Sequence, residues 1–149
     1  MKRNYAFLCC LAMSLIFFSA GCKKKVKPLS ERIAKAWTAE AVKHNTTSVY
    51  VRGGSGNSVP GYSNFRLNLT GASNGAVYTE WDNKTFAGTW ELQGDSKLIL
   101  KGLNPEPSGT GGTVEFNIIS IDDSKLVIKN VNPSKKTGDT INEYTLTNP

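Results

Sequence analysis

The chain has 149 residues, of which 39% are hydrophobic and 20% are charged, a composition that suits one globular domain and excludes collagen, a coiled coil and a wholly disordered protein. The formal net charge of +6 comes from residues 1–27, which hold six basic and no acidic side chains. From Pro28 onward, 12 basic residues face 12 acidic ones. The domain after Pro28 therefore has no charge excess for binding nucleic acid, and we expect none as a partner.

The first 21 residues have the pattern of an export signal. Lys2 and Arg3 precede a mostly apolar run of 14 residues, 5–18, which is shorter than the about 20 residues that span a bilayer. Small residues at 19–21 then stand directly before Cys22. This arrangement resembles the lipobox of bacterial lipoproteins, which implies cleavage before Cys22 and acylation of that cysteine. The alternatives are an uncleaved membrane helix and an ordinary cleaved signal.

The resemblance to lipoproteins also implies a location. Two or more acyl chains on Cys22 would hold the protein stably on a membrane. Residues 22–28 form a lysine-rich tether, which either contacts anionic headgroups or stays solvated. Lysines at these positions resemble neither the acidic surface-export signal of Bacteroidetes lipoproteins nor the aspartate of inner-membrane retention. We therefore expect a lipid-anchored protein of the outer membrane that faces the periplasm.

The cysteines after processing leave no thiol chemistry. Cys9 and Cys10 depart with the signal, and Cys22 carries the lipid. The mature domain, residues 29–149, therefore has neither a disulfide framework nor a zinc-thiolate site.

This domain is predicted to begin with a short helix and to continue as strands. Ser30 is expected to cap a helix that runs to about Ala36, with Glu31 in its first turn. Beyond it the apolar period changes to two, in runs rich in β-branched and aromatic residues. The predicted strands cover residues 37–44, 62–70, 77–81, 85–93, 97–101, 113–121, 125–131 and 140–147, with 48–52 as a candidate extension of the first hairpin.

The connections between these strands favour an antiparallel meander. Short polar turns at 71–75, 94–96 and 122–124 suit hairpins, and none of the connections has the length and helical pattern of a parallel crossover. The loops 53–61 and 102–112 are longer and rich in Gly, Ser and Pro, so we expect them to be exposed. The prediction is an all-β, up-and-down, eight-stranded barrel, because closure removes exposed sheet edges. A two-sheet sandwich is the alternative.

Alternation within the strands assigns an inner face. Ile118 and Ile119 break the alternation, which predicts a β-bulge beside them. An eight-stranded barrel is just wide enough either to be filled by side chains or to hold one small ligand. The residues expected to line the interior, and to contact a ligand there, are Trp37, Phe65, Leu67, Leu69, Trp90, Leu92, Leu98, Leu100, Phe116, Ile118, Tyr144 and Leu146.

One hairpin resembles a known family. Residues 86–100, with the sequence FAGTWELQGDSKLIL, are similar to the Gly-Thr-Trp, polar turn, Leu-x-Leu hairpin of bacterial lipocalin-like lipoproteins, which are common in Bacteroidetes. Leu29 and Trp37 resemble the segment that leads into the first strand of that family. The resemblance implies a lipocalin-like barrel. The Gly-x-Trp of the better-known lipocalins reads Lys-Ala-Trp at 35–37, and no arginine of the last strands is placed to stack on this tryptophan.

Patterns for catalysis and metal binding are absent from the sequence. His44 is the only histidine, and no Gly-x-Ser-x-Gly motif accompanies it. Asp122 and Asp123 are interpreted as turn residues and not as cation ligands. We therefore expect no enzymatic activity, no metal and no cofactor. The tripeptide 139–141 resembles the O-glycosylation site of Bacteroidetes proteins, which makes Thr140 a candidate for modification.

Two functions remain for such a domain. The first is to bind a small apolar ligand inside the barrel, which a cavity above about 300 Å³ would support. The second is that of an accessory envelope lipoprotein that acts through a protein partner. A filled interior together with an exposed apolar patch would support this second function.

Overall fold

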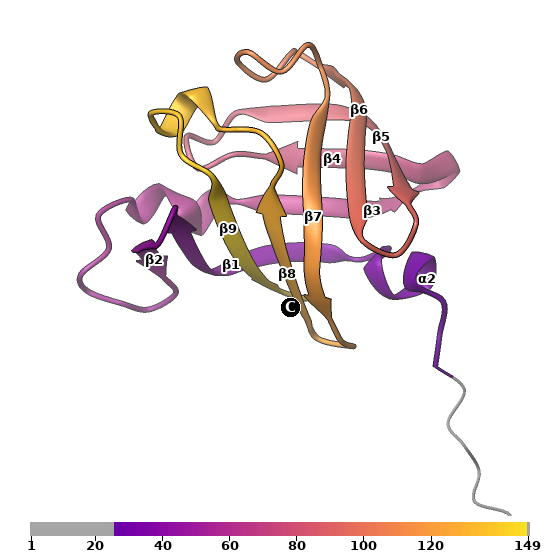
Figure 1. Ribbon diagram of the computed structural model, residues 1–149, viewed down its shortest axis with the longest axis horizontal. Coiled ribbons are helices and arrows are strands. Elements are labelled where there is room, and N and C mark those ends of the chain that lie inside the picture. The colour runs from indigo at the N-terminus through magenta and orange to yellow at the C-terminus, as the bar shows by residue number, and fades with distance from the viewer. Residues whose placement is uncertain (1–25, 149) are drawn as a thin grey trace, which may run out of the picture.

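The computed structural model describes residues 26–148. Its main elements are one short helix, α2, and nine antiparallel strands (Figure 1). The elements are α2 (Leu29–Ile33), β1 (Ala36–His44), β2 (Thr47–Val51), β3 (Arg66–Gly71), β4 (Gly75–Thr79), β5 (Thr85–Gln93), β6 (Lys97–Asn104), β7 (Val114–Ile121), β8 (Lys125–Asn130) and β9 (Asn142–Thr147). Three 3₁₀ helices lie between them: η2 (Pro60–Asn64), η3 (Ala72–Asn74) and η4 (Lys135–Thr137). None of the described helices is long and apolar enough to cross a membrane. The expected signal of residues 1–21, Cys22 and most of the lysine-rich tether lie outside the described residues.

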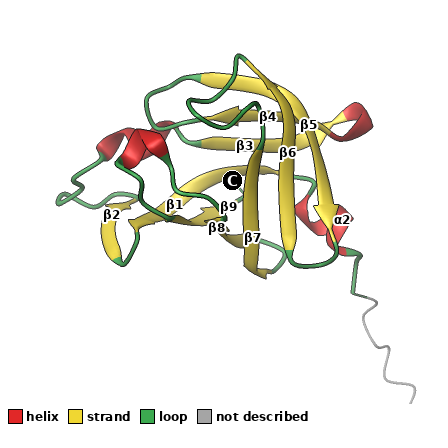
Figure 2. Cartoon of the chain, turned by 45° about the horizontal axis from the view of Figure 1, so that its top comes forward, coloured by secondary structure: helices red, strands yellow, loops and turns green. Residues whose placement is uncertain are grey.

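Eight of the strands close into a barrel. Each strand from β3 to β8 pairs antiparallel with the next, and β1 pairs with both β3 and β9 (Figure 2). The predicted eight-stranded up-and-down barrel is therefore confirmed, and the two-sheet alternative does not form. Strand β3 pairs only with the first half of β1. Strand β2 pairs with the second half of β1, along the edge that β3 leaves free. The candidate extension at 48–52 is thus a ninth strand, Thr47–Val51.

The predicted helix is wrong at both ends. The helix ends at Ile33 and not near Ala36, because Lys35 already takes part in sheet bonding through its carbonyl, which accepts from the backbone N–H of Leu69 at 3.0 Å. Pro28, not Ser30, is the N-cap, and its carbonyl receives the first helical N–H groups.

The second predicted strand also begins later than expected. Residues 62–64 belong to η2, and strand β3 starts only at Arg66. Pro60 at the start of η2 has the fixed φ that suits a helical turn, and this turn places Tyr62 over the barrel end with 1% of its surface exposed. Tyr62 therefore caps the core from a helical turn instead of extending a strand.

The predicted bulge in β7 is confirmed. The pairing of β7 with β8 shifts register between Ile118 and Ser120. Ile119, the extra residue, is 56% exposed, whereas Ile121 packs against the core. The bulge thus returns the apolar side chains of β7 to the inner face.

The barrel interior is filled by apolar side chains. Ten of the twelve predicted interior residues are buried, and the other two, Leu92 and Ile118, are half-buried and pack against the same core. At the end where α2 lies, the indole nitrogen of Trp37 donates a hydrogen bond to the carbonyl of Ile33 at 2.8 Å. Because Trp37 and Ile33 are both fully buried, α2 closes this end of the barrel.

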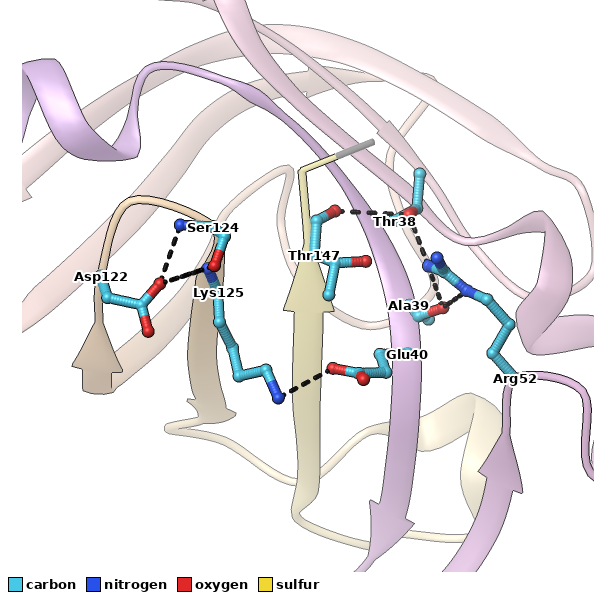
Figure 3. Close-up of polar contacts among 8 residues, drawn as sticks. All are labelled: Thr38, Ala39, Glu40, Arg52, Asp122, Ser124, Lys125 and Thr147. Atoms are coloured by element: carbon cyan, nitrogen blue, oxygen red, sulfur yellow. Dashed lines mark hydrogen bonds and ion pairs between the residues drawn. The ribbon is translucent and has the colours of Figure 1, made fainter.

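Polar side chains tie the closing strands together on the outer surface (Figure 3). Lys125 of β8 and Glu40 of β1 form an ion pair of 3.1 Å that reaches across β9. Arg52, just after β2, donates to the carbonyl of Ala39 and to the hydroxyl of Thr38, both at 2.6 Å. The outer face is therefore polar where the barrel closes.

Candidate functional site

The two ends of the barrel differ. The α2 end carries α2 and the hairpin turns β3–β4, β5–β6 and β7–β8. The opposite end, called the loop end here, carries η2, the β4–β5 turn and the longer connections 105–113 and 131–141 (Figure 1). A cavity of about 160 Å³ lies at the loop end, between the end of β4, residues 108–115, residues 130–136 and Tyr144.

This loop-end pocket lies above the apolar core. Among the twelve interior residues predicted from the sequence, only Tyr144 lines it; the other eleven pack below or around it. The assignment of these twelve residues as ligand contacts stays a prediction. The sequence reasoning missed Glu80, Asn130 and Lys136, which lie at strand ends or in a loop where a period of two gives no signal.

Two tyrosines, Tyr78 of β4 and Tyr144 of β9, contribute to the pocket's lining and join it to the aromatic core. Tyr144 stacks on Phe65 with ring centroids 4.8 Å apart, and Tyr78 meets the same ring edge-on at 5.7 Å. Burial raises the pKa of Tyr144 to about 12 and raises the pKa of Tyr78 well above its ordinary value. Both phenols are therefore neutral at physiological pH and able to donate and to accept hydrogen bonds.

A partly buried ion cluster of Lys136, Glu80 and Asp82 lies along one wall, to which Lys136 and Glu80 contribute directly. The ammonium group of Lys136, in η4, bonds Glu80 and lies 2.9 Å from a carboxylate oxygen of Asp82. It also lies 5.6 Å from the ring centroid of Phe86. The side chains of Lys136 and Glu80 are only 14% and 13% exposed. Because the partners come from the β4–β5 turn and the β8–β9 loop, the cluster fixes these two connections to each other.

The pKa values of Asp82 and Lys136 are shifted in the directions that keep both groups charged. Burial acts to raise the pKa of Asp82, but hydrogen bonds from Lys136 and from the backbone of Lys84 outweigh it, so the pKa falls below its ordinary value. Burial likewise acts to lower the pKa of Lys136, but its bonds to Glu80 and Asp82 outweigh it and raise the pKa. Both groups are therefore ionised throughout the neutral range.

The β6–β7 loop forms a second wall of the pocket and is held in shape by its own hydrogen bonds. In the β6–β7 loop, Thr110 donates through its hydroxyl to the carbonyl of Pro107 at 2.8 Å, and Glu106 accepts from the backbone N–H of Gly111 at 2.8 Å. At the end of β8, the side-chain oxygen of Asn130 is shielded from solvent and has no hydrogen-bond partner. The pocket thus has a preformed wall in the β6–β7 loop, whereas the Asn130 oxygen is buried away from the cavity.

The other candidate residues of the sequence lie elsewhere. His44 pairs through Nε2 with the hydroxyl of Tyr62 at 2.7 Å. Asp122 accepts from the backbone N–H groups of Ser124 and Lys125, which is the expected role of a turn residue (Figure 3). Among residues 26–148, no group of three or more His, Cys, Asp or Glu side chains is arranged to hold a metal ion.

Thr140, the candidate for glycosylation, is half-buried in a polar network. Its hydroxyl lies 2.7 Å from the side-chain oxygen of Asn142 and 2.7 Å from the hydroxyl of Thr137. Modification of Thr140 would have to displace these bonds, and it stays a prediction.

Comparison with known proteins supports the fold. No model of a protein family matches the sequence, and no curated protein matches it significantly. Among solved structures, a lipocalin-like protein from Bacteroides uniformis matches with a TM-score of 0.51 and 15% identity, over 79% of this chain and 99% of that one. The chain therefore has a lipocalin-like fold, as the hairpin at 86–100 predicted.

Proposed function

We propose that this protein is a lipid-anchored envelope protein of lipocalin-like fold that binds a small ligand in the loop-end pocket. The observation that carries the proposal is the preformed cavity itself, with two tyrosines in its lining and walls braced by hydrogen bonds and ion pairs. Lining groups held in place before binding need not be ordered when a ligand arrives.

The position of the pocket suits a membrane anchor at Cys22. The described chain enters the fold at α2, where Leu29 and Ile33 pack against the barrel (Figure 1). The pocket lies at the opposite end. With acyl chains on Cys22 in the outer membrane, the loop end would point away from the bilayer into the periplasm, where a soluble ligand can reach it.

The cavity disfavours a large apolar ligand inside the barrel. Its volume of about 160 Å³ is below the 300–1,000 Å³ typical of sites for drug-sized molecules, and large side chains fill the interior beneath it. We therefore place the ligand at the loop end, among polar groups.

The accessory function through a protein partner has less support. It calls for an exposed apolar patch. The large exposed apolar residues of the described chain are Val26, Val51, Val77 and Ile119. They lie before α2 and on β2, β4 and β7, and no two of these strands are neighbours in the sheet. The filled interior meets one condition for this function, but the described residues offer no such patch. The loop-end cavity, although it is smaller than about 300 Å³, therefore makes ligand binding our first candidate.

Native mass spectrometry of the chain extracted in detergent from its host tests ligand binding. We expect an added small mass that collisional activation removes. Ser108→Trp places a large ring at the pocket and should abolish the added mass, whereas Ser55→Trp, in the exposed loop before η2, should keep it. A bare protein mass in every sample would contradict the proposed ligand binding.

Metabolic labelling with a fatty-acid analogue tests the anchor separately. We expect label on the wild-type chain and none on Cys22→Ser. An unlabelled wild-type chain would refute the anchor and leave the pocket proposal standing.

A further inference from the structure

His44, at the end of β1, contacts the helical turn that covers the loop end of the barrel. It is the only histidine of the chain, and its Nε2 lies 2.7 Å from the hydroxyl of Tyr62 in η2. We propose that this His44–Tyr62 pair is a pH-sensitive latch: neutral His44 holds η2 closed over the barrel, and protonation of His44 loosens η2. The inference does not depend on the proposed ligand binding, because it concerns a different contact.

Tyr62 is the residue through which η2 covers the core. Its side chain is 1% exposed, and its ring lies 6.2 Å, 6.5 Å and 6.1 Å, between centroids, from the rings of Tyr50, Trp81 and Tyr144. Burial raises the pKa of the Tyr62 phenol well above its ordinary value. Tyr62 therefore stays neutral, and it brings no negative charge that could compensate a proton on His44.

Few side-chain hydrogen bonds hold η2 in place. Among the described residues, the His44–Tyr62 pair is the one such bond between β1 and η2. The other side chain through which η2 bonds outside itself is that of Asn64, which donates to the carbonyl of Trp81 at 3.4 Å. A weaker bond between His44 and Tyr62 should therefore let η2 open more often.

A positive charge on His44 would meet no free carboxylate. The residues that pair with His44 in the neighbouring strands, Thr47 and Asn142, are neutral. The charged residues of β1, β2, β9, η2 and the loop before β9, together with the carboxylate that acts on Tyr62, are Glu40, Lys43, Glu80, Lys135, Lys136, Asp139 and Glu143. The four carboxylates among them already pair with lysines. Protonation therefore favours an opened state in which the imidazolium reaches water.

The direction of the pH dependence follows from the burial of His44. Its side chain is half-buried, and this burial lowers its pKa below the ordinary value of 6.5. The closed state therefore binds fewer protons than the opened one, so closure is strongest above pH 6.5 and weakens as the pH falls through the lowered value. At pH 5.5, one unit below 6.5, this effect can weaken closure by at most about tenfold.

NMR of the full chain in detergent tests the latch. A chain purified without a histidine tag gives one imidazole signal, whose titration should report a pKa below 6.5. The backbone N–H groups of Tyr62 and Phe65 bond within this turn, to the carbonyls of Val59 and Tyr62. After correction for intrinsic exchange rates, we expect their protection from hydrogen exchange to fall by about three- to tenfold between pH 7.5 and pH 5.5.

Two comparisons within the same experiment show that the opening is local. The amides of η2 should exchange faster than those of β6 at both pH values, because η2 opens without unfolding of the barrel. The backbone N–H of Gly75 closes the matching 3₁₀ turn η3, at the α2 end, by bonding the carbonyl of Ala72. Its protection should not change with pH, since no histidine lies there.

Three variants assign the effect to the latch. His44→Gln keeps a side chain that can bond Tyr62 but does not titrate, so the fall in η2 protection should vanish. Tyr62→Phe keeps the ring and removes the hydroxyl, and it should lower η2 protection by roughly two- to tenfold already at pH 7.5. Tyr50→Phe makes the same change on the neighbouring ring and should leave the pH response of the wild type intact.

Four results would overturn the inference: a pKa of His44 at or above 6.5, protection of η2 that does not change with pH, protection of η2 equal to that of β6, or a His44→Gln variant with the pH response of the wild type. The first three are measured on the wild-type chain, so they decide the question even if His44→Gln does not fold.

Discussion

Lys136 in η4 and Asp82 in the β4–β5 turn lie 54 positions apart in the chain, and the ammonium nitrogen of the lysine is 2.9 Å from a carboxylate oxygen of the aspartate. The same ammonium group bonds Glu80. Both connections line or adjoin the loop-end pocket. The pocket therefore depends on a polar contact between two loops, and the apolar core supports it only from below.

Loss of this contact should destabilise the fold. Lys136→Met leaves Glu80 largely buried and unpaired, so we expect the free energy of unfolding in urea to fall by about 2–4 kcal/mol. Lys125→Met breaks the pair with Glu40, whose side chains are 46% and 39% exposed, and should cost less than about 1 kcal/mol. Equal losses in the two variants would show that burial of the Lys136 cluster contributes nothing.

The same cluster predicts how stability depends on pH. The pKa of Asp82 is below its ordinary value of 3.8, so its contribution is present above pH 3.8 and is lost as the pH falls through the lowered folded-state value. The pKa of Lys136 is above its ordinary value of 10.5, so its contribution is present below pH 10.5 and is lost as the pH rises through the raised value.

Urea unfolding of the wild type and Lys136→Met across this range tests the pH dependence. The difference in unfolding free energy should be largest on the plateau between these limits and should shrink on either side. A difference that does not change with pH would refute the role of ionisation.

The barrel could be predicted from the sequence because a half-buried strand records its inner face in every second residue. Leu67 and Leu69 in β3, or Tyr144 and Leu146 in β9, follow this rule and are buried. The resemblance of residues 86–100 then favoured the lipocalin-like form. The rule fails at η2, where Tyr62 is buried from a helical turn that no alternation announces.

The pocket could not be predicted in the same way. Alternation identifies side chains that point inward, but it does not say whether they fill the space between them. Glu80 and Lys136 are charged residues in or beside connections, where solvent exposure is the ordinary expectation. Only the folded chain brings them together. Alternation alone could have predicted that Tyr78 points inward, since it shares the inner face of β4 with Ala76.

Gly88, in the hairpin that resembles the lipocalin-like family, should be hard to replace. A Cβ atom at this position would clash with the carbonyl oxygen of Lys101, beside the register shift between β5 and β6. Gly88→Ala should therefore lower the free energy of unfolding by about 2 kcal/mol or more.

Thermal and urea unfolding of Gly88→Ala can be compared with Gly56→Ala. A Cβ at Gly56 would meet no atom within 4 Å, and we expect a change within about 0.5 kcal/mol there. If both variants were as stable as the wild type, close packing of β5 against β6 would not explain why residue 88 is a glycine.

Two tryptophans should respond to the same substitution with losses of stability that differ in size. The indole nitrogen of Trp37 donates to the carbonyl of Ile33, so Trp37→Phe removes a buried hydrogen bond and leaves a void beside α2, at a cost of about 2 kcal/mol or more. The indole nitrogen of Trp81 is buried without a partner, so Trp81→Phe removes an unsatisfied donor and should cost less than about 1 kcal/mol. Urea unfolding of both variants measures the difference. A loss in Trp81→Phe as large as in Trp37→Phe would mean that ring volume, and not the hydrogen bond that closes the α2 end, decides the stability at these sites.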